Sequence, residues 1–150
     1  MPQSLAKVYV HIIFSTKNRK PFITKDITNE LYAYISGILK NLKSDVIKIN
    51  GTQDHLHILC TLPRTITIAK VLEETKKSSS KWIKTKGVKW VKFAWQDGYG
   101  IFSISESDLI ETTSYIANQE NHHKRLSFKE ELKKFLEDYG IEYDERYLWD

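Results

Sequence analysis

The stretch "GTQDHLHILCTL", residues 51–62, predicts a β-strand with two histidines on one face. Because successive side chains of a strand point to opposite faces, His55 and His57 are expected to lie on the same side. The apolar side chains of the stretch are expected to point the other way, into a core: Leu56, Ile58, Cys60 and Leu62. Two imidazoles side by side on a strand of this kind suggest a functional surface.

The neighbouring segments predict the fold around this strand. Residues 7–15, "KVYVHIIFS", alternate as a strand does, with His11 on the face opposite Val10 and Ile12. Helical spacing follows over about 26–43 and again over about 67–84, and further strands are expected at 46–50 and 101–105. Asn50-Gly51 is a strong turn signal, so strands two and three should form a hairpin. The order is β-α-β-β-α-β, which indicates an α+β, ferredoxin-like fold: an antiparallel sheet with helices on one face.

Two more helices are expected after this core. The first starts near Ser105, where Ser105 and Asp108 have the spacing of a capping box, and continues through "ESDLIETTSYIANQENHH". Its buried side is predicted to hold Leu109, Ile110, Thr113, Ile116 and Ala117. The second follows a capping box of Ser127 and Glu130 and stops at Gly140. We therefore expect one domain over 1–150, with the βαββαβ core at 1–105, the additional helices at 106–150, and the aromatic tail packed back on it.

Charge is distributed unevenly along the chain. The net charge is +4, but residues 1–103 carry 17 Lys and Arg against 7 Asp and Glu, whereas residues 104–150 carry 6 against 12. The excess of cations suggests a polyanionic partner, although a solvated lysine-rich helix face would look the same. The start of the sequence does not resemble a signal peptide, and no apolar run is long enough for a membrane span. Cys60 is the only cysteine, so a reduced, cytoplasmic protein without membrane association is expected.

The histidine pair and one tyrosine suggest a specific chemistry. His55 and His57 could ligate a divalent cation together with an amide or carboxylate oxygen from elsewhere. That donor set suits Mg²⁺ or Mn²⁺ better than zinc, which would prefer a third His or a Cys. Tyr115 lies on the less apolar side of its helix, one turn before Gln119, and could attack a metal-polarised phosphodiester. Two ordinary alternatives stay open: a histidine pair without metal, and an exposed or interface tyrosine.

Several motifs in order resemble the single-tyrosine HUH transposases of the insertion-sequence two-hundred / six-hundred-and-five group, including their repeat-associated relatives. "HLHIL" resembles the His-hydrophobic-His signature, and "WQDGYGIFSIS", residues 95–105, resembles a second family segment. "SYIANQENHHKRLSFKEEL", residues 114–132, resembles the family's tyrosine helix, and the "GIEYDERYLW" ending is also similar. The resemblance covers nearly the whole chain.

This resemblance implies a DNA transposase that cuts and rejoins single-stranded DNA next to imperfect hairpins. It implies Tyr115 as the nucleophile that takes the 5′-phosphate and frees a 3′-OH. It also implies His55, His57 and Gln119 as the ligands of Mg²⁺ or Mn²⁺. Insertion-sequence members are typically homodimers, in which the His pair and the tyrosine can come from different subunits, whereas the repeat-associated relatives tend to be monomers. The resemblance implies a homodimer for this chain but leaves the monomer open.

Other residues are expected at the margin of this site. The candidates for contacts to DNA phosphates are Lys17, Arg19, Lys20, Arg64, Lys76, Lys77, Lys81, Lys84 and His122. His11 is expected to be structural, His123 to lie at the surface, and Asp54 either to orient a metal ligand or to serve the hairpin turn. Two competing functions remain: a non-catalytic single-stranded nucleic-acid-binding module of RNA-recognition topology, and a metal-dependent hydrolytic nuclease.

Overall fold

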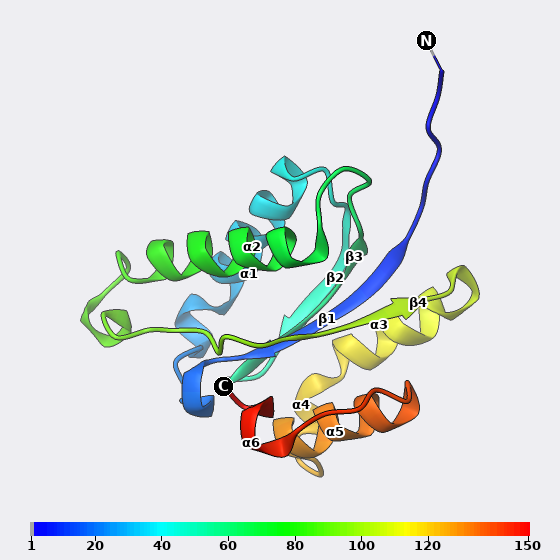
Figure 1. Ribbon diagram of the computed structural model, residues 1–150. Coiled ribbons are helices and arrows are strands. Elements are labelled where there is room, and N and C mark those ends of the chain that lie inside the picture. Colours follow the sequence, from blue (N-terminus) through cyan, green and yellow to red (C-terminus); the bar gives the residue numbers. More distant parts are fainter. Residues whose placement is uncertain (1) are drawn as a thin grey trace.

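The computed structural model describes residues 2–150, and its centre is a four-stranded antiparallel sheet (Figure 1). The strands are β1 (Tyr9–Ser15), β2 (Val46–Gly51), β3 (His55–Thr61) and β4 (Gly100–Ile104), in the spatial order β2-β3-β1-β4. β1 pairs with both β3 and β4, and β2 with β3. The predicted βαββαβ order and ferredoxin-like sheet are confirmed.

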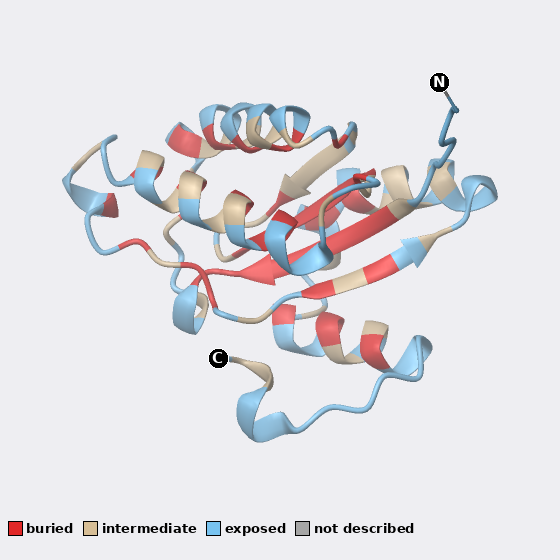
Figure 2. Cartoon of the chain, turned by 45° about the horizontal axis from the view of Figure 1, so that its top comes forward, coloured by how far each residue is buried: buried red, intermediate tan, exposed pale blue. Residues whose placement is uncertain are grey.

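Helices cover both faces of this sheet. α1 (Lys25–Asn41) and α2 (Ile68–Ile83) lie on one face, where Val10, Ile12 and Phe14 of β1 join the main apolar core. The other face is covered by α3 (Leu109–Ala117), α4 (Gln119–His122) and α5 (Phe128–Asp138), and α6 (Glu145–Leu148) follows near the end of the chain. Short 3-10 turns lie at Lys17–Arg19, Val88–Trp90 and Glu106–Asp108. β1 and β3 are therefore buried along nearly their whole length (Figure 2).

The second layer of helices buries the histidine face of the sheet. Ile13 on β1 packs there with Phe102 and with the apolar side of α5. α5 begins as expected, because the Ser127 side chain accepts from the Glu130 backbone and the Glu130 side chain accepts from that of Ser127. It ends before Gly140, whose φ of +63° is one that glycine adopts without strain. The predicted capping box and stop are thus confirmed.

The helix predicted through residues 105–123 is wrong in three respects. It begins with a 3-10 turn, because the Ser105 hydroxyl donates to the Asp108 carboxylate and caps no backbone N–H. It is interrupted at Asn118, whose φ of −100° and ψ of 24° leave the α region, so Tyr115 and Gln119 lie on separate helices. Of the predicted buried side only Ile116 is fully buried, and Ile110 is 85% exposed. Ile116, near the C-terminal end of α3, is therefore the residue of this side that packs into the interior.

The aromatic tail packs back on the domain, as expected. Leu148 and Trp149 lie against the apolar cluster of α5, and the Trp149 carbonyl accepts a hydrogen bond from Arg19 at 3.0 Å. The backbone N–H of Gly98 donates to the Asp150 carbonyl at 2.9 Å. Among residues 2–150, none of the helices combines the length and apolarity that crossing a bilayer would require.

Candidate active site

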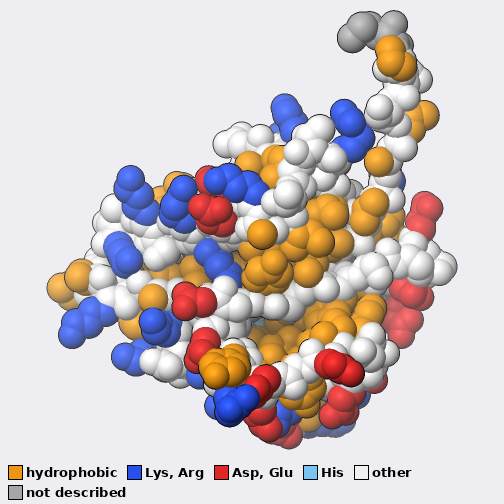
Figure 3. Space-filling model, in the orientation of Figure 1, with side chains coloured by type: hydrophobic (Ala, Val, Ile, Leu, Met, Phe, Trp, Pro, Cys, Tyr) orange, Lys and Arg blue, Asp and Glu red, His pale blue; other side chains and the backbone are white. Residues whose placement is uncertain are grey.

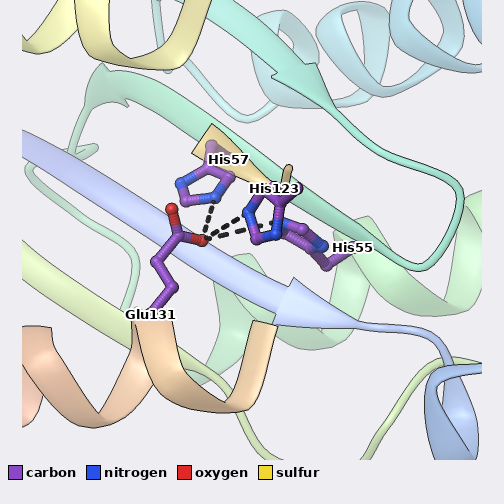
Figure 4. Close-up of side chains that lie close together, drawn as sticks. All are labelled: His55, His57, His123 and Glu131. Atoms are coloured by element: carbon purple, nitrogen blue, oxygen red, sulfur yellow. Dashed lines mark hydrogen bonds and ion pairs between the residues drawn. The ribbon is translucent and has the colours of Figure 1, made fainter. Parts of the chain in front are cut away.

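The two histidines of β3 lie at the centre of a buried polar cluster between the sheet and α5 (Figure 4). His55 and His57 are both fully buried and point to the same face, as their spacing predicts. Their Nε2 atoms face the carboxylate of Glu131 on α5, at 3.5 Å from His55 and 2.8 Å from His57. The Nε2 atom of His123 lies 3.1 Å from the same oxygen, Glu131 Oε1. Three imidazoles thus converge on one carboxylate oxygen.

The opposite nitrogens of the strand histidines have partners of their own. His55 Nδ1 donates to Asp54 Oδ1 at 2.7 Å, and Asp54 also accepts from the Thr52 hydroxyl. His57 Nδ1 lies 2.8 Å from Nε2 of His11, which is itself 1% exposed. Both imidazole rings are therefore fixed through Nδ1 while Nε2 faces the cluster. Proteins commonly orient metal-binding histidines in this way.

Burial and hydrogen bonding set the charges in the cluster. Burial lowers the pKa of His11 to about 3 and that of His57 to about 4, so both rings are neutral at pH 7. Burial alone would lower the pKa of His55, but its bonds to Asp54 and Glu131 raise it above the ordinary value. Burial alone would raise the pKa of Glu131, but the three histidines hold it well below its usual range. Glu131 is therefore ionised, with imidazole nitrogens around it, and the ionised form of a carboxylate is the one that binds cations.

Tyr115 reaches this cluster from α3. Its hydroxyl donates to Glu131 Oε2, and its ring lies 6.0 Å from that of His57, centroid to centroid. Burial, followed by the bond to Glu131, raises the pKa of the phenol above its ordinary value. His122 stacks on the Tyr115 ring at 4.3 Å, and both side chains line a pocket of about 550 Å³. The hydroxyl is thus held at the cluster and adjoins a space that a ligand can enter.

Gln119 lies at the edge of the same cluster and is fully buried. Its Oε1 is 3.4 Å from His55 Nε2, while its Nε2 has no hydrogen-bond partner among the described residues. Tyr115, Gln119 and the strand histidines are brought together within a single chain. The structure therefore gathers every residue that the sequence analysis placed at the centre of the site.

The cluster could hold a metal ion. His55, His57, His123 and Glu131 each offer one ligand atom, and these atoms lie within 4.8 Å of one another. The donors fit a divalent cation in chemistry as well as in spacing, since imidazole nitrogens and a carboxylate oxygen are standard protein ligands. Gln119 could add a further ligand from the edge of the cluster through Oε1, which lies 3.4 Å from His55 Nε2.

Two residues of this cluster were missed or misplaced by the sequence analysis. The prediction of a surface position for His123 is wrong, because its side chain is only 12% exposed and contacts Glu131. Glu131 was not singled out, yet a signal was present. It lies on the apolar side of α5 with Phe128 and Leu132, where a carboxylate is out of place unless it has partners. The Asp54 carboxylate accepts from His55 Nδ1 and from the Thr52 hydroxyl, so it fixes the His55 ring and also contacts the hairpin turn.

The candidate DNA contacts fall into separate regions. Lys17, Arg19 and Lys20 follow β1, whose last residue, Ser15, pairs with His55, so this basic loop adjoins the site. The lysines of α2 lie across the sheet from the cluster, and Arg64 is exposed after β3. On the face shown in Figure 3, Lys and Arg lie mainly over the upper layer, whereas Asp and Glu gather over α5 and its surroundings.

Lys76 differs from the other lysines of α2. Its ammonium donates to the carbonyls of Gln96, Asp97 and Gly98 at 2.9, 3.1 and 2.6 Å. It also lies over the rings of Phe14 and Tyr99. These contacts give Lys76 a structural role in holding the 96–98 loop against α2, and leave it the least available of the lysines for phosphate.

Comparison with known proteins identifies one family and two solved structures with a similar fold. Residues 4–119 match the model of the family described as IS200-like transposases. A proposed transposase from Deinococcus radiodurans R1 superposes with a TM-score of 0.61 at 20% identity, covering 79% of this chain and 98% of that one. A REP-associated tyrosine transposase bound to a REP hairpin superposes with a TM-score of 0.61 at 17% identity, covering 84% of this chain and 74% of that one. No curated protein matches the chain.

Proposed function

The chain belongs to the IS200-like transposases, and from this premise we propose that it cuts and rejoins single-stranded DNA through a covalent phosphotyrosine at Tyr115. The observation that carries the proposal is the hydroxyl of Tyr115, which is held by Glu131 beside the two histidines of β3. A nucleophile at a candidate metal site is the arrangement that this transesterification requires.

The first step makes one bond and breaks another. Tyr115 Oη attacks the scissile phosphorus, its bond to phosphorus forms, and the bond from phosphorus to the 3′-oxygen breaks. Glu131 Oε2, which already accepts the hydrogen bond from Tyr115, is placed to receive the phenolic proton. The departing 3′-oxygen takes up a proton, and a 3′-OH results. Attack of a 3′-OH on the phosphotyrosine reverses the sequence and rejoins DNA without an external energy source.

We assign the metal in this reaction to His55, His57 and Gln119, with Mg²⁺ or Mn²⁺ as the cofactor. A bound divalent ion supplies Lewis-acid polarisation of the phosphodiester. The chain itself orients the two imidazoles through Asp54 and His11 and keeps the His57 ring neutral for binding. Near the site, Lys17, Arg19 and Lys20 are suited to hold the DNA backbone.

The DNA substrate we propose is a single strand with a hairpin. One structural neighbour is a tyrosine transposase bound to a REP hairpin, and its fold matches over most of this chain. The uneven charge of the sequence also favours a polyanion.

The test uses end-labelled single-stranded hairpins from the flanks of the gene, incubated with the protein in Mn²⁺ or in EDTA. We expect a labelled band at the mass of the protein, dependent on metal and lost in Tyr115→Phe. Tyr147→Phe is the matched control, because that ring is 66% exposed and lies outside the cluster. Cleavage without a band would identify a hydrolytic nuclease, and binding without cleavage a nucleic-acid-binding module. Either result overturns the proposal.

We also propose that the protein is a homodimer. Its active sites can then be composite, with the histidines and the tyrosine from different subunits, or each can be formed by a single chain. Mixing Tyr115→Phe with His57→Ala protein distinguishes these arrangements. Recovery of the adduct shows that tyrosine and histidines come from different subunits. No recovery, with both proteins dimeric, shows that each chain uses its own tyrosine, an arrangement supported by the contact of Tyr115 with Glu131.

A further inference from the structure

We infer that His123 and Glu131 complete the metal site, so that the protein binds Mn²⁺ or Zn²⁺ in preference to Mg²⁺. This inference deepens the proposed function and rests on it for the role of the metal. It adds two metal ligands, His123 and Glu131, which lie outside β3 and outside the Tyr115–Gln119 segment. It also changes the expected ion, because the sequence-based preference for Mg²⁺ or Mn²⁺ assumed that no third histidine was present.

The directions of the imidazole rings support this ligand set. All three rings present Nε2 to one point, and the two strand histidines are tied at Nδ1 by Asp54 and His11. Metal sites commonly have histidine ligands whose second ring nitrogen is held by a hydrogen-bond partner, as it is here in His55 and His57.

The spacing of the donors supports it as well. Ligands held tetrahedrally at about 2.1 Å from an ion lie roughly 3.4 Å from one another. Glu131 Oε1 lies 2.8 Å from Nε2 of His57, 3.1 Å from that of His123 and 3.5 Å from that of His55. The whole donor set spans no more than 4.8 Å. The shortest of these distances is about 0.6 Å below that spacing and the widest donor pair is up to about 1.4 Å above it, so side-chain shifts of up to about 1 Å would admit an ion among these four atoms.

The position of Glu131 explains why a carboxylate occurs inside this core. Glu131 is 1% exposed on the apolar side of α5, where an ionised group costs free energy unless it is paired or bound to metal. Its two oxygens face different partners, Oε1 the histidines and Oε2 the hydroxyl of Tyr115. One side chain thus links the ion to the nucleophile.

The chemistry of the donors decides between ions. Mg²⁺ prefers oxygen ligands and retains its water, whereas imidazole suits transition metals, whose affinities rise from Mn²⁺ to Zn²⁺ in a given site. Three nitrogens and one carboxylate oxygen therefore favour Zn²⁺ and Mn²⁺ over Mg²⁺. Gln119 Oε1, 3.4 Å from His55 Nε2, would add an oxygen donor at the edge of this set.

The first experiment is calorimetric titration of metal-free protein, without DNA, with Mn²⁺, Zn²⁺ and Mg²⁺ in turn. We expect Mn²⁺ and Zn²⁺ to bind at least about 10-fold more tightly than Mg²⁺. Glu131→Gln should weaken Mn²⁺ binding by about 10-fold or more, since loss of even an outer-shell partner costs that much. Glu137→Gln, an exposed glutamate on the same helix, is the matched control and should bind as the parent does. Equal affinity for Mg²⁺, or no effect of Glu131→Gln, overturns the inference.

A second measurement guards against loss of folding in the variants. Pulsed electron paramagnetic resonance of bound Mn²⁺ counts the coupled imidazole nitrogens, and circular dichroism of the same samples checks the fold. We expect three imidazoles in the parent and in Tyr115→Phe, and two in His123→Ala. Two imidazoles in the parent would remove His123 from the ligand set. If the parent protein showed two imidazoles but still formed the covalent adduct with DNA, the inferred ligand set would be wrong and the proposed function would stand.

Discussion

A single methyl group at Gly51 should disturb the candidate metal site, because Gly51 ends β2 directly opposite the start of β3. A Cβ atom built at this position would lie 2.1 Å from the backbone carbonyl oxygen of His55 and 3.0 Å from Cα of Leu56. Both contacts are to backbone, so no side-chain rotation relieves them. Gly51→Ala must therefore move the two strands apart at the residue that carries the first histidine.

The size of the effect follows from the clash. Because real Cβ contacts are essentially never below 3.0 Å, the His55 carbonyl has to move by roughly 1 Å, and overpacking of this kind costs about 1–3 kcal/mol of unfolding free energy. A displacement of about 1 Å at a functional group can also cost as much as 10²-fold in activity. We expect Gly51→Ala to lower both the unfolding free energy and the affinity for Mn²⁺.

Urea unfolding in EDTA measures the unfolding free energy, and titration with Mn²⁺ measures the affinity for the ion. Gly37→Ala is the matched control, since its Cβ meets nothing within 4 Å on an exposed turn of α1. There the loss of glycine flexibility in a helix should raise the unfolding free energy by about 0.5–1 kcal/mol. If Gly51→Ala were as stable as Gly37→Ala and bound Mn²⁺ normally, the account of how β2 positions His55 would be refuted.

Three further predictions concern stability. Lys76→Met should lower the unfolding free energy by about 2 kcal/mol or more, because hydrogen bonds from a charged group are worth about 1.5–3 kcal/mol each. The control Lys81→Met, at an exposed position, should change the unfolding free energy little. Equal effects of the two substitutions in urea unfolding would contradict the structural role of Lys76. Ser127→Ala should cost about 1 kcal/mol by removing the cap of α5, and an unchanged thermal midpoint would show that the cap is dispensable. Without metal, the folded protein should lose stability as the pH falls from 6.5 toward 4. The pKa of His57 is about 4 in the folded chain and about 6.5 in the unfolded chain, so unfolding takes up protons in this window. Urea unfolding at pH 7 and pH 5 measures the change, and an unfolding free energy that rises toward pH 5 would contradict the prediction.

Much of the fold could be predicted because its signals are local. Alternation identified β1 and β3, the Asn50-Gly51 turn marked the hairpin, and the capping box at Ser127 marked the start of α5. The shared face of His55 and His57 needed only the period of a strand.

The residues that complete the cluster depend on how distant elements dock. His123 approaches His55 only because the chain turns at Asn118 and again before α5. Helical periodicity, continued through Asn118, correctly placed Gln119 and His122 on the side of Tyr115, but it gave no sign that His123 would reach Glu131. Glu131 could have been noticed as a carboxylate in an apolar stripe, but its two partners on β3, His55 and His57, lie more than 70 positions away in the sequence. Periodicity carries no information about such a contact.

The most direct test of the central claim is to locate the covalent bond between protein and DNA. A cleavage reaction on a single-stranded hairpin, digested with protease and nuclease, should yield one modified peptide in mass spectrometry, with a nucleotide 5′-phosphate on Tyr115. A phosphate on any other residue, or DNA cleaved with every tyrosine unmodified, would contradict the assignment of Tyr115 as the nucleophile.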